Sequence, residues 1–331
     1  MRAVVLVGGL GTRLRPLTHH IPKQMLPVVD RPMIEVVLAR LHAHGVDDVV
    51  LSLGYRADVF AAAYPDGTCA GVRLHYAVED EPLDTAGAVR FAARHAGIDE
   101  RFLVMNSDVL TDLDVGALVR FHEAHGAEGT IALHEVDDPS RFGVVQTDGD
   151  GRVVAFIEKP PRDAAPTNRI NAGTYVLEPS VLDRIPDGRP VSIERATFPA
   201  MAADGTLFAM DDGGAYWIDA GTPATYLQAQ LDAVGATSAI APGAAVDRAA
   251  VVERSVLGDG VVVDEGADVL RSIVLRGAKI GRGAHVVDSI VGPGATVGDG
   301  ATVDALSILG EGAVVASGTV VSNGRVPEPV A

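Results

Sequence analysis

From the first residue to about residue 235, short apolar runs alternate with longer segments of helical periodicity. The apolar runs, each the length of a buried strand, are residues 4–7, 48–53, 72–78 and 102–106. Residues 32–44 and 85–95 place apolar side chains three and four positions apart, which is typical of a helix with one buried face. This alternation predicts an α/β domain over residues 1–235, with an open, mainly parallel, Rossmann-like sheet.

A different pattern begins near residue 238, where glycines and aliphatic residues recur at a fixed spacing. The glycines, 17 positions apart and finally 18, are Gly243, Gly260, Gly277, Gly294 and Gly312. Three aliphatic rows follow the same steps: Val246, Val263, Ile280, Val297 and Val315; Val252, Val269, Val286, Val303 and Val321; and Val256, Ile273, Ile290 and Ile308. Three inward rows predict a triangular parallel β-helix of about five coils over residues 240–322, in a domain of residues 236–331.

Charge and cysteine content limit the partners and the compartment. The formal net charge is −17, which argues against nucleic acid or an anionic membrane as a partner. No apolar run approaches the length of a membrane span, and residues 1–20 lack the pattern of a signal peptide. Cys69 is the only cysteine, so no intramolecular disulfide forms. We expect a soluble, cytoplasmic protein.

The segment after the first strand concentrates glycine and positive charge. It reads GGLGTRLRP over residues 8–16 and PKQMLP over residues 22–27. Glycines let backbone N–H groups approach phosphate oxygens, and Arg13 and Lys23 add positive charge. Neither the P-loop pattern nor the dinucleotide fingerprint is present. Because ligands of open α/β sheets bind beyond the carboxyl ends of the strands, the segment predicts a polyphosphate site there.

The joined motifs GGxGTRLxP and PKxMLP resemble the sugar-1-phosphate nucleotidylyltransferase family, which makes nucleotide sugars from an NTP and a sugar 1-phosphate. The resemblance covers about residues 3–230, and the segments SIER at 192–195 and FP at 198–199 look most like its guanylyltransferase branch, which makes GDP-mannose. The later repeats are similar to hexapeptide repeats of left-handed β-helices, with one face shortened by a residue. The left-handedness is implied by this similarity alone.

The resemblance implies a nucleotide site and a metal site. Arg13 is expected to clamp the β- and γ-phosphates and Lys23 to neutralise charge at the α-phosphate, so both are candidate catalytic residues. The implied nucleotide-binding residues are Leu6, Gly8, Gly9, Gly11, Thr12, Arg13, Glu79, Asp84 and Thr85. The implied cofactor is Mg²⁺, held by Asp108 of an NSD segment and Asp219 of WIDAGTP. Relatives have glycine in place of Ser107.

Three further motifs resemble the family's sugar-phosphate site. They are FGVV at residues 142–145, IEKP at 157–160 and INAGTY at 170–175. The implied sugar-phosphate-binding residues are Asn106, Gly143, Glu158, Lys159 and Asn171. By this resemblance Glu158 accepts hydrogen bonds from sugar hydroxyls, Lys159 holds the sugar phosphate, and the backbone of Gly143 and the side chain of Asn171 contact the sugar.

The choice of base depends on Glu79, five positions before Asp84 in the family's base-reading segment. Pyrimidine-using relatives tend to have glutamine there, whereas a carboxylate only accepts hydrogen bonds and suits the N1–H and N2–H₂ groups of guanine. Against thymine, unpaired acceptors would cost about 1–3 kcal/mol. We therefore expect GTP as donor and a GDP-sugar, GDP-mannose or a related one, as product. Relatives usually have glycine at Asp84, and the effect of that difference stays open.

Three alternatives remain. A paralogue that uses dTTP or UTP, or a cyclitol phosphate, would carry the same motifs. A regulatory paralogue that binds GDP-sugars without catalysis is the second. The third is a bifunctional protein with an acyltransferase β-helix, for which His285, the only histidine of the repeat, is a weak candidate base. The β-helix more simply predicts a homo-oligomer, because stacked coils offer flat faces and an open end.

Overall fold

The computed structural model describes residues 1–54 and 56–327. The chain forms two compact units, of which the first comprises Met1–Gly9 and Ile34–Trp217 and the second Leu10–Met33 and Ile218–Ala331. The glycine-rich segment is therefore divided between the units after Gly9. The predicted domain boundary at residues 235 and 236 stays a prediction.

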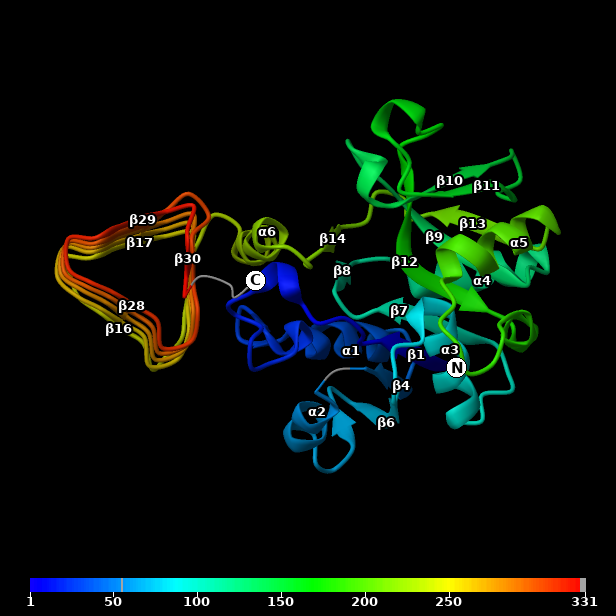
Figure 1. Ribbon diagram of the computed structural model, residues 1–331, viewed down its shortest axis with the longest axis horizontal. Helices are drawn as coiled ribbons and strands as arrows, with labels where there is room; N and C mark the ends of the chain where they lie inside the picture. Colours follow the sequence, from blue (N-terminus) through cyan, green and yellow to red (C-terminus); the bar gives the residue numbers. More distant parts are fainter. Residues whose placement is uncertain (55, 328–331) are drawn as a thin grey trace. The chain divides into compact units, whose positions relative to one another are not determined.

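A ten-stranded sheet forms the centre of the first unit (Figure 1), with the strand order β11-β10-β12-β7-β1-β4-β6-β5 and with β9 and β13 joined through β12. The strands are β1 (Arg2–Leu6), β4 (Asp48–Leu53), β5 (Thr68–Cys69), β6 (Val72–Val78), β7 (Phe102–Asn106), β9 (Gly129–Glu135), β10 (Gly143–Thr147), β11 (Val153–Glu158), β12 (Arg169–Leu177) and β13 (Leu207–Asp211). The helices are α1 (Met33–Ala43), α2 (Ala57–Ala63), α3 (Asp84–His95), α4 (Val115–His125) and α5 (Phe198–Ala203).

The parallel part of this sheet confirms the predicted α/β fold. Strands β7, β1, β4 and β6 run parallel, and their carboxyl ends are level, since Leu6 pairs with both Asn106 and Ser52 and Leu53 pairs with Val78. The middle residues of β1, β4 and β7 are fully buried, as in sheets with both faces covered. Helix α3 packs on β1 and β4. The carboxyl ends of these four strands therefore lie side by side, as the predicted ligand site beyond them requires.

The other part of the sheet is more antiparallel than predicted. Strand β10 pairs antiparallel with β11 and β12, and β12 pairs antiparallel with β7 and β9. Strands β10 and β11 are separated by only five residues, too few for the helical crossover that parallel neighbours need. A core of large side chains, including Phe156, Tyr175 and Phe198, packs beneath these strands.

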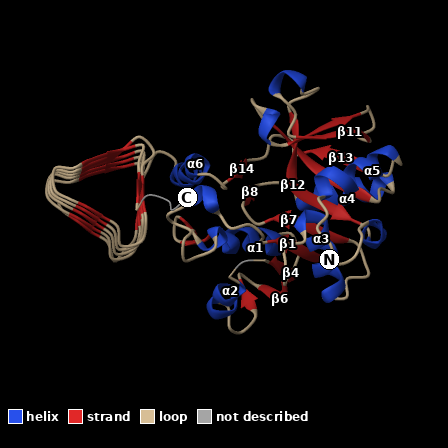
Figure 2. Cartoon of the chain, in the orientation of Figure 1, coloured by secondary structure: helices blue, strands red, loops and turns tan. Residues whose placement is uncertain are grey.

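The second unit contains the β-helix, whose triangular section has strands on its sides and turns at its corners (Figure 2). Its first sheet is β15 (Ala239–Ile240), β18 (Val256–Leu257), β21 (Ile273–Val274), β24 (Ile290–Val291), β27 (Ile308–Leu309) and β30 (Arg325–Val326). Its second is β16 (Ala245–Val246), β19 (Val262–Val263), β22 (Lys279–Ile280), β25 (Thr296–Val297) and β28 (Val314–Val315). Its third is β17 (Val251–Glu253), β20 (Asp268–Leu270), β23 (His285–Val287), β26 (Thr302–Asp304) and β29 (Val320–Ser322). All neighbouring strands in the three sheets are parallel, so the predicted β-helix is confirmed.

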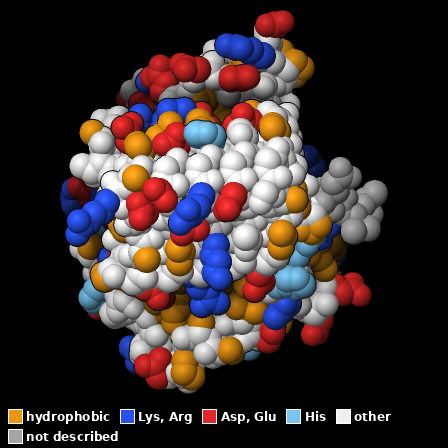
Figure 3. Space-filling model, turned by 90° about the vertical axis from the view of Figure 1, so that its left-hand side faces the viewer, with side chains coloured by type: hydrophobic (Ala, Val, Ile, Leu, Met, Phe, Trp, Pro, Cys, Tyr) orange, Lys and Arg blue, Asp and Glu red, His pale blue; other side chains and the backbone are white. Residues whose placement is uncertain are grey.

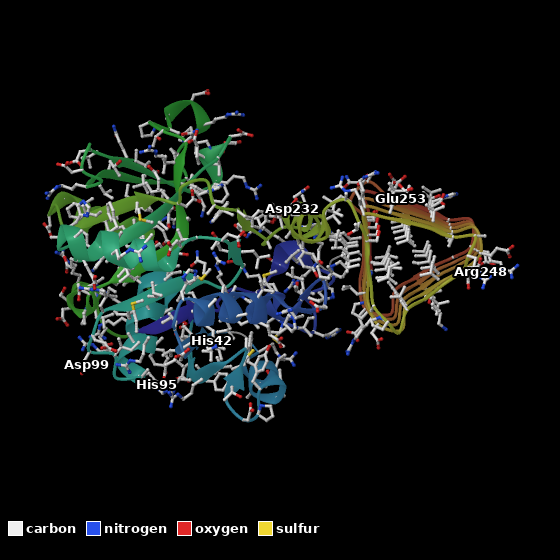
Figure 4. All side chains as sticks on the ribbon, turned by 180° about the vertical axis from the view of Figure 1, so that it is seen from behind. His42, His95, Asp99, Asp232, Arg248 and Glu253 are labelled. Carbon is white, nitrogen blue, oxygen red and sulfur yellow. The ribbon has the colours of Figure 1, made fainter. Side chains whose placement is uncertain are left out.

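The third predicted inward row is wrong by one residue. The interior cluster contains Leu257, Val274, Val291 and Leu309, stacked with the two other rows inside the coils (Figure 4). The predicted residues Val256, Ile273, Ile290 and Ile308 are also buried, but they lie outside that cluster. Because side chains alternate along a strand, each predicted residue faces away from the coil interior. The serine before each one is buried, and its hydroxyl accepts a backbone N–H of the next coil, as Ser255 does from Ser272 at 3.0 Å.

The remaining elements of the second unit are short. They are two 3₁₀ turns at Thr12–Leu14 and Lys23–Met25, the two-residue strands β2 (Pro27–Val28) and β3 (Arg31–Pro32), and helix α6 (Pro223–Val234). Strands β8 (Val109–Thr111) and β14 (Trp217–Asp219) are also present, and the first unit contains 3₁₀ turns at Pro139–Arg141, Arg162–Ala164 and Pro179–Arg184 and a π-helical turn at Ile193–Thr197. In the described part of the chain no helix is both long and apolar enough to cross a membrane. Acidic and basic side chains are interspersed on the face shown in Figure 3.

Candidate active site

The glycine-rich loop begins where β1 ends at Leu6. Gly9 has φ +94° and Gly11 has φ +61°, a left-handed backbone that favours glycine. A Cβ added at Gly8 or Gly9 would meet no atom within 4 Å, so the backbone of this turn is open on that side. Leu6, Gly8 and Gly9 belong to the first unit. The turn exposes backbone in the way that close approach of a phosphate requires.

The second part of the loop is held by contacts inside the second unit. The Thr18 hydroxyl donates to the Gly11 carbonyl oxygen at 2.7 Å, and the Leu14 N–H donates to the same oxygen at 3.0 Å. A Cβ on Gly11 would lie 3.3 Å from the Lys23 Cβ. The structure therefore brings Gly11, Thr12 and Lys23 together in one compact turn, with Arg13 exposed next to them.

The base-reading residue Glu79 follows β6 and organises its own loop. Its Oε1 accepts from the Ser52 hydroxyl at 3.0 Å, and its Oε2 accepts from the Leu83 N–H at 2.9 Å. Each carboxylate oxygen has two acceptor positions, so both oxygens retain one for a ligand. Glu79 is therefore fixed in orientation and still able to accept a pair of hydrogen bonds.

Asp84 and Thr85 begin helix α3. Asp84 has φ +58°, and its Oδ1 accepts the Thr85 N–H at 2.7 Å. The Thr85 hydroxyl donates to Glu194 Oε2 at 2.7 Å and accepts the Ile193 N–H at 2.8 Å. The left-handed backbone at Asp84 is the physical reason why glycine suits this position, and aspartate is one of the few other residues that adopts it readily.

Replacing Asp84 separates its backbone effect from its charge. Asp84→Gly and Asp84→Ala both remove the carboxylate and its bond to Thr85, but only alanine is strained at φ +58°. We expect Asp84→Gly to be more stable than Asp84→Ala by about 1 kcal/mol, measured by urea unfolding. Equal stability would show that the left-handed backbone costs nothing here. The KM for GTP of Asp84→Gly then reports the effect of losing the carboxylate together with its bond to Thr85.

The sugar-phosphate candidates gather on β10 and β11. Gly143 pairs with Glu158 across the two strands, and a Cβ on Gly143 would lie 3.1 Å from Glu158 Oε2 and 2.6 Å from the Phe156 ring. Only glycine leaves room for this approach. Glu158 Oε1 lies 2.9 Å from Lys159 Nζ, and the Lys159 side chain is 57% exposed. An exposed ammonium next to a largely buried carboxylate suits a ligand with a phosphate and hydroxyl groups.

Asn171 lies beside a bulge in β12. The register against β9 shifts between Asn171 and Tyr175, a feature common next to active sites. Asn171 Oδ1 accepts the Gly173 N–H at 2.9 Å, and its Nδ2 donates to the Tyr175 hydroxyl at 2.8 Å. Gly173 has φ +75°, and a Cβ there would lie 2.7 Å from Asn106 Nδ2. The structure therefore brings Asn106 and Asn171 to the same bulge.

The motif reading did not identify Tyr175 and Glu194 as site residues. Tyr175 is fully buried; burial, together with the nearby carboxylates of Glu194 and Glu158, raises its pKa well above the ordinary value. Its phenol therefore stays protonated beside Asn171. Glu194 accepts from both Thr85 and Ser192, so it connects the base-reading helix with the segment that carries SIER. The available sequence signals were the positions of Tyr175 inside the INAGTY motif and of Glu194 inside the SIER segment.

Trp217, the first residue of the WIDAGTP motif, is a third residue to which the motifs assigned no role. Its indole N–H donates to the Ala172 carbonyl at 2.9 Å, and its ring stacks on His134 with centroids 5.0 Å apart. His134 Nδ1 lies 2.6 Å from Asp212 Oδ2, and Phe142 meets the indole edge-on. These contacts fix Trp217 next to the strands that carry Gly143 and Asn171.

The two candidate metal ligands come from different units. Asp108 lies between β7 and β8 in the first unit, and Asp219 ends β14 in the second, where its Oδ1 accepts the Gly221 N–H at 2.8 Å. Among the described residues no group of three His, Cys, Asp or Glu side chains could hold a metal. A carboxylate is the kind of oxygen donor that Mg²⁺ takes from a protein, so each aspartate has the chemistry of a Mg²⁺ ligand.

His285 in the β-helix has an ordinary structural environment. Its ring lies in a regular coil, half exposed, with Nδ1 2.9 Å from Asp268 Oδ2 of the preceding coil. This contact links two coils, so a structural role is the simpler interpretation of His285. It gives no support to acyltransferase chemistry.

Comparison with known proteins shows the family to which the chain belongs. The family described as Nucleotidyl transferase matches residues 2–234, and the family described as GMPPB C-terminal domain matches residues 234–329. The mannose-1-phosphate guanylyltransferase of Mycobacterium tuberculosis is 44% identical over 234 residues, 70% of this chain and 64% of that protein. The mannose-1-phosphate guanyltransferase of Aspergillus fumigatus is 46% identical over 233 residues, 69% of this chain and 62% of that protein. The chain thus spans less than two thirds of the length of these relatives.

Solved structures share the fold. HddC from Yersinia pseudotuberculosis, solved alone and in complex with GMP-PN, has a TM-score of 0.60 and 30% identity, and the match covers 70% of this chain and 98% of HddC. A putative glucose-1-phosphate thymidylyltransferase from Bacillus anthracis has a TM-score of 0.64 at 24% identity, a likeness of fold. The resemblance expected from the motifs is confirmed: the chain belongs to the nucleotidyl transferase family, and the relatives it resembles at 44–46% identity are mannose-1-phosphate guanylyltransferases.

Proposed function

We propose that this protein transfers GMP from GTP to a sugar 1-phosphate, mannose 1-phosphate or a close analogue, and releases pyrophosphate. The observation that carries the base assignment is the geometry of Glu79. Both of its carboxylate oxygens are oriented by Ser52 and Leu83, and both retain an acceptor position. A fixed pair of acceptors complements the adjacent N1–H and N2–H₂ donors of guanine. The named relatives at 44–46% identity support the same assignment.

The reaction requires that two anions, the sugar 1-phosphate and the nucleoside triphosphate, be held in line. A sugar-phosphate oxygen attacks the α-phosphorus, and the bond to the pyrophosphate oxygen breaks. We assign Arg13 to the β- and γ-phosphates and Lys23 to the charge that develops around the α-phosphate. The loop would present its backbone to the phosphates at Gly8, Gly9, Gly11 and Thr12. Leu6, at the end of β1, would also contact the nucleotide. Most of the rate enhancement then comes from position and charge, as is general for phosphoryl-type transfers.

The remaining candidate residues are assigned to the nucleoside, the sugar phosphate or the metal. Glu79, Asp84 and Thr85 would contact the nucleoside, whereas Asn106, Gly143, Glu158, Lys159 and Asn171 would hold the sugar phosphate. Asp108 and Asp219 would bind Mg²⁺, which supplies charge neutralisation between the phosphates when bound. Cys69 is a buried free thiol and the only cysteine of the sequence, which suits a reducing compartment, and we place the protein in the cytoplasm. We also infer self-association through the β-helix, where the aliphatic side chains of Val314 and Val320 are exposed.

The base assignment is tested by the choice of nucleotide. Purified protein is given GTP, dTTP, UTP or ATP with mannose 1-phosphate or glucose 1-phosphate, and pyrophosphate release is measured. We expect the highest kcat/KM with GTP and mannose 1-phosphate, and a loss of about 10-fold or more with GTP in Glu79→Gln, because a mispaired polar edge costs about 1–3 kcal/mol. Glu81→Gln, exposed in the same loop, is the matched control. Faster turnover with dTTP would contradict the assignment.

A further inference from the structure

The part of the phosphate-binding loop from Leu10 onward shares one compact unit with the β-helix. Leu10–Met33, which contains Arg13 and Lys23, folds with Ile218–Ala331. The β-helix begins more than two hundred residues later in the chain than this loop. A domain that served only to associate subunits would have no need to contact the loop. The contacts inside this unit therefore indicate a second use of the β-helix.

Helix α6 binds the loop at its second half. The Tyr226 hydroxyl and the Gln230 amide Nε2 both donate to the Pro27 carbonyl oxygen, at 2.6 and 2.5 Å. Gln230 Oε1 in turn accepts the Val29 N–H at 2.7 Å. Val29 has φ +58°, which is strained for a β-branched residue and persists only where the surroundings hold it. Because Tyr226 and Gln230 are fully buried, these bonds hold the segment after Lys23 in one conformation.

The last coil of the β-helix binds the loop at its first half. Arg325 of β30 donates from Nη1 to the Arg15 carbonyl oxygen at 2.9 Å. A Cβ on Gly310, two residues after Ile308, would lie 2.9 Å from the Pro16 Cβ, so the coil and the loop are in close contact. The outward row of Val256, Ile273, Ile290 and Ile308 is buried, and α6 packs on β18 of the same sheet. One side of the β-helix is thus used for internal packing.

We propose that the β-helix is a positioning element for the phosphate-binding loop, acting through Arg325 of its last coil. The proposal rests on the proposed function, in which Arg13 holds the triphosphate two residues before the carbonyl that Arg325 binds. A glycine-rich loop loses conformational freedom when it closes on a ligand, and a loop that is already ordered loses less. Hydrogen bonds from charged donors are stronger than those from neutral ones, which makes Arg325 an effective anchor. Arg325 is a positioning residue because it acts through the loop backbone.

The first test compares nucleotide affinity in variants of Arg325. Arg325→Ala removes the anchor, Arg325→Lys keeps a charged donor, and Arg282→Ala is the matched control on the same β-helix, 70% exposed beside Glu265. We expect Arg325→Ala to raise the Kd and the KM for GTP about 3- to 10-fold, part of the free energy of one charge-assisted hydrogen bond, with the KM for mannose 1-phosphate unchanged. Arg325→Lys should recover part of the affinity, and Arg282→Ala should bind GTP as the unmodified protein does.

A second variant disturbs the contact between the last coil and the loop without changing the net charge of the protein. Gly310→Ala adds a Cβ against Pro16, and it should also raise the Kd for GTP. The molar mass in solution is measured for every variant by light scattering. Weaker GTP binding with unchanged mass supports the positioning role. Unchanged GTP affinity in Arg325→Ala, or a loss seen only together with dissociation into smaller species, overturns it.

Hydrogen exchange tests the loop without any substrate. The Leu14, Arg15 and Leu17 amides donate to carbonyls inside the loop, so their exchange reports its order. We expect faster exchange at these amides in Arg325→Ala and not in Arg282→Ala. Equal exchange would overturn the proposal even if the enzyme were a GTP-dependent transferase. If the unmodified protein bound no GTP but the loop still loosened in Arg325→Ala, the proposed function would fail and the positioning role would stand.

Discussion

Lys23→Ala is expected to lower kcat/KM for GTP by about 10²- to 10³-fold, the usual effect of removing one preorganised group that stabilises transition-state charge. The substitution suits the structure because alanine keeps the Cβ that packs against Gly11, so the turn retains its shape. The loss should fall mainly on kcat, since charge at the α-phosphate grows as the bond to pyrophosphate breaks. Pyrophosphate release under steady-state conditions measures both parameters.

Lys279→Ala is the matched control for this experiment. Lys279 is one of the three lysines of the chain and lies exposed on β22 of the same unit. Its removal changes net charge by the same amount and should leave kcat/KM unaltered. If Lys23→Ala kept more than a tenth of the activity while remaining folded, Lys23 would not be the group that neutralises the α-phosphate.

The second large effect concerns the two aspartates assigned to Mg²⁺. Asp108→Asn and Asp219→Asn each remove one charged oxygen donor without changing size, and each should lower kcat/KM by about 10²- to 10³-fold at fixed Mg²⁺. The Mg²⁺ concentration for half-maximal activity should rise in both variants, because the remaining ligands bind the ion less tightly. Chelation with EDTA should abolish activity, and added Mg²⁺ should restore it.

Asp232→Asn is the comparison for these variants. Asp232 is an exposed carboxylate on α6, labelled in Figure 4, and belongs to the same unit as Asp219. Its substitution should leave the Mg²⁺ dependence unchanged. Full activity of Asp219→Asn at low Mg²⁺ would remove Asp219 from the metal site.

Several elements could be predicted closely from sequence. The strands at Asp48–Leu53, Val72–Val78 and Phe102–Asn106 have the predicted bounds, and α3 begins one residue before the predicted start. Unbroken apolar runs of strand length have few other solutions in a parallel sheet, so local pattern is enough. The family was also predictable, because a phosphate-binding turn demands glycines and cations at close, fixed spacing.

The third row of the β-helix shows where pattern is insufficient. Each coil has two adjacent aliphatic residues at this face, such as Val256 and Leu257, and either could point inward. A serine precedes the first of them in each coil and favours that residue as the inward one, and this prediction is wrong. The ambiguity exists because both residues are buried, the second in the coil interior and the first on the outer face, where α6 packs on β18. A face buried on both sides loses the alternation that gives register from sequence.

The base-reading loop gives a second example. The sequence identified Glu79 and the unusual Asp84, but it did not show that Ser52, 27 residues earlier, orients the Glu79 carboxylate, or that Asp84 has a left-handed backbone. It also did not link Thr85 with Glu194, which lie 109 residues apart and share a hydrogen bond. Such contacts depend on how the chain folds back on itself.

The sequence by itself determined the fold class, the family and the candidate residues that would touch phosphate, because each depends on residue types at short, fixed spacing. Only the tertiary structure decided which residues hold them: Ser52 beside Glu79, Glu194 beside Thr85, and Gln230 and Arg325 on the loop of Arg13 and Lys23. The physical reason is that a hydrogen bond between distant segments leaves no periodic trace along the chain. The glycine-rich loop can therefore be predicted from sequence, whereas its attachment to the β-helix cannot.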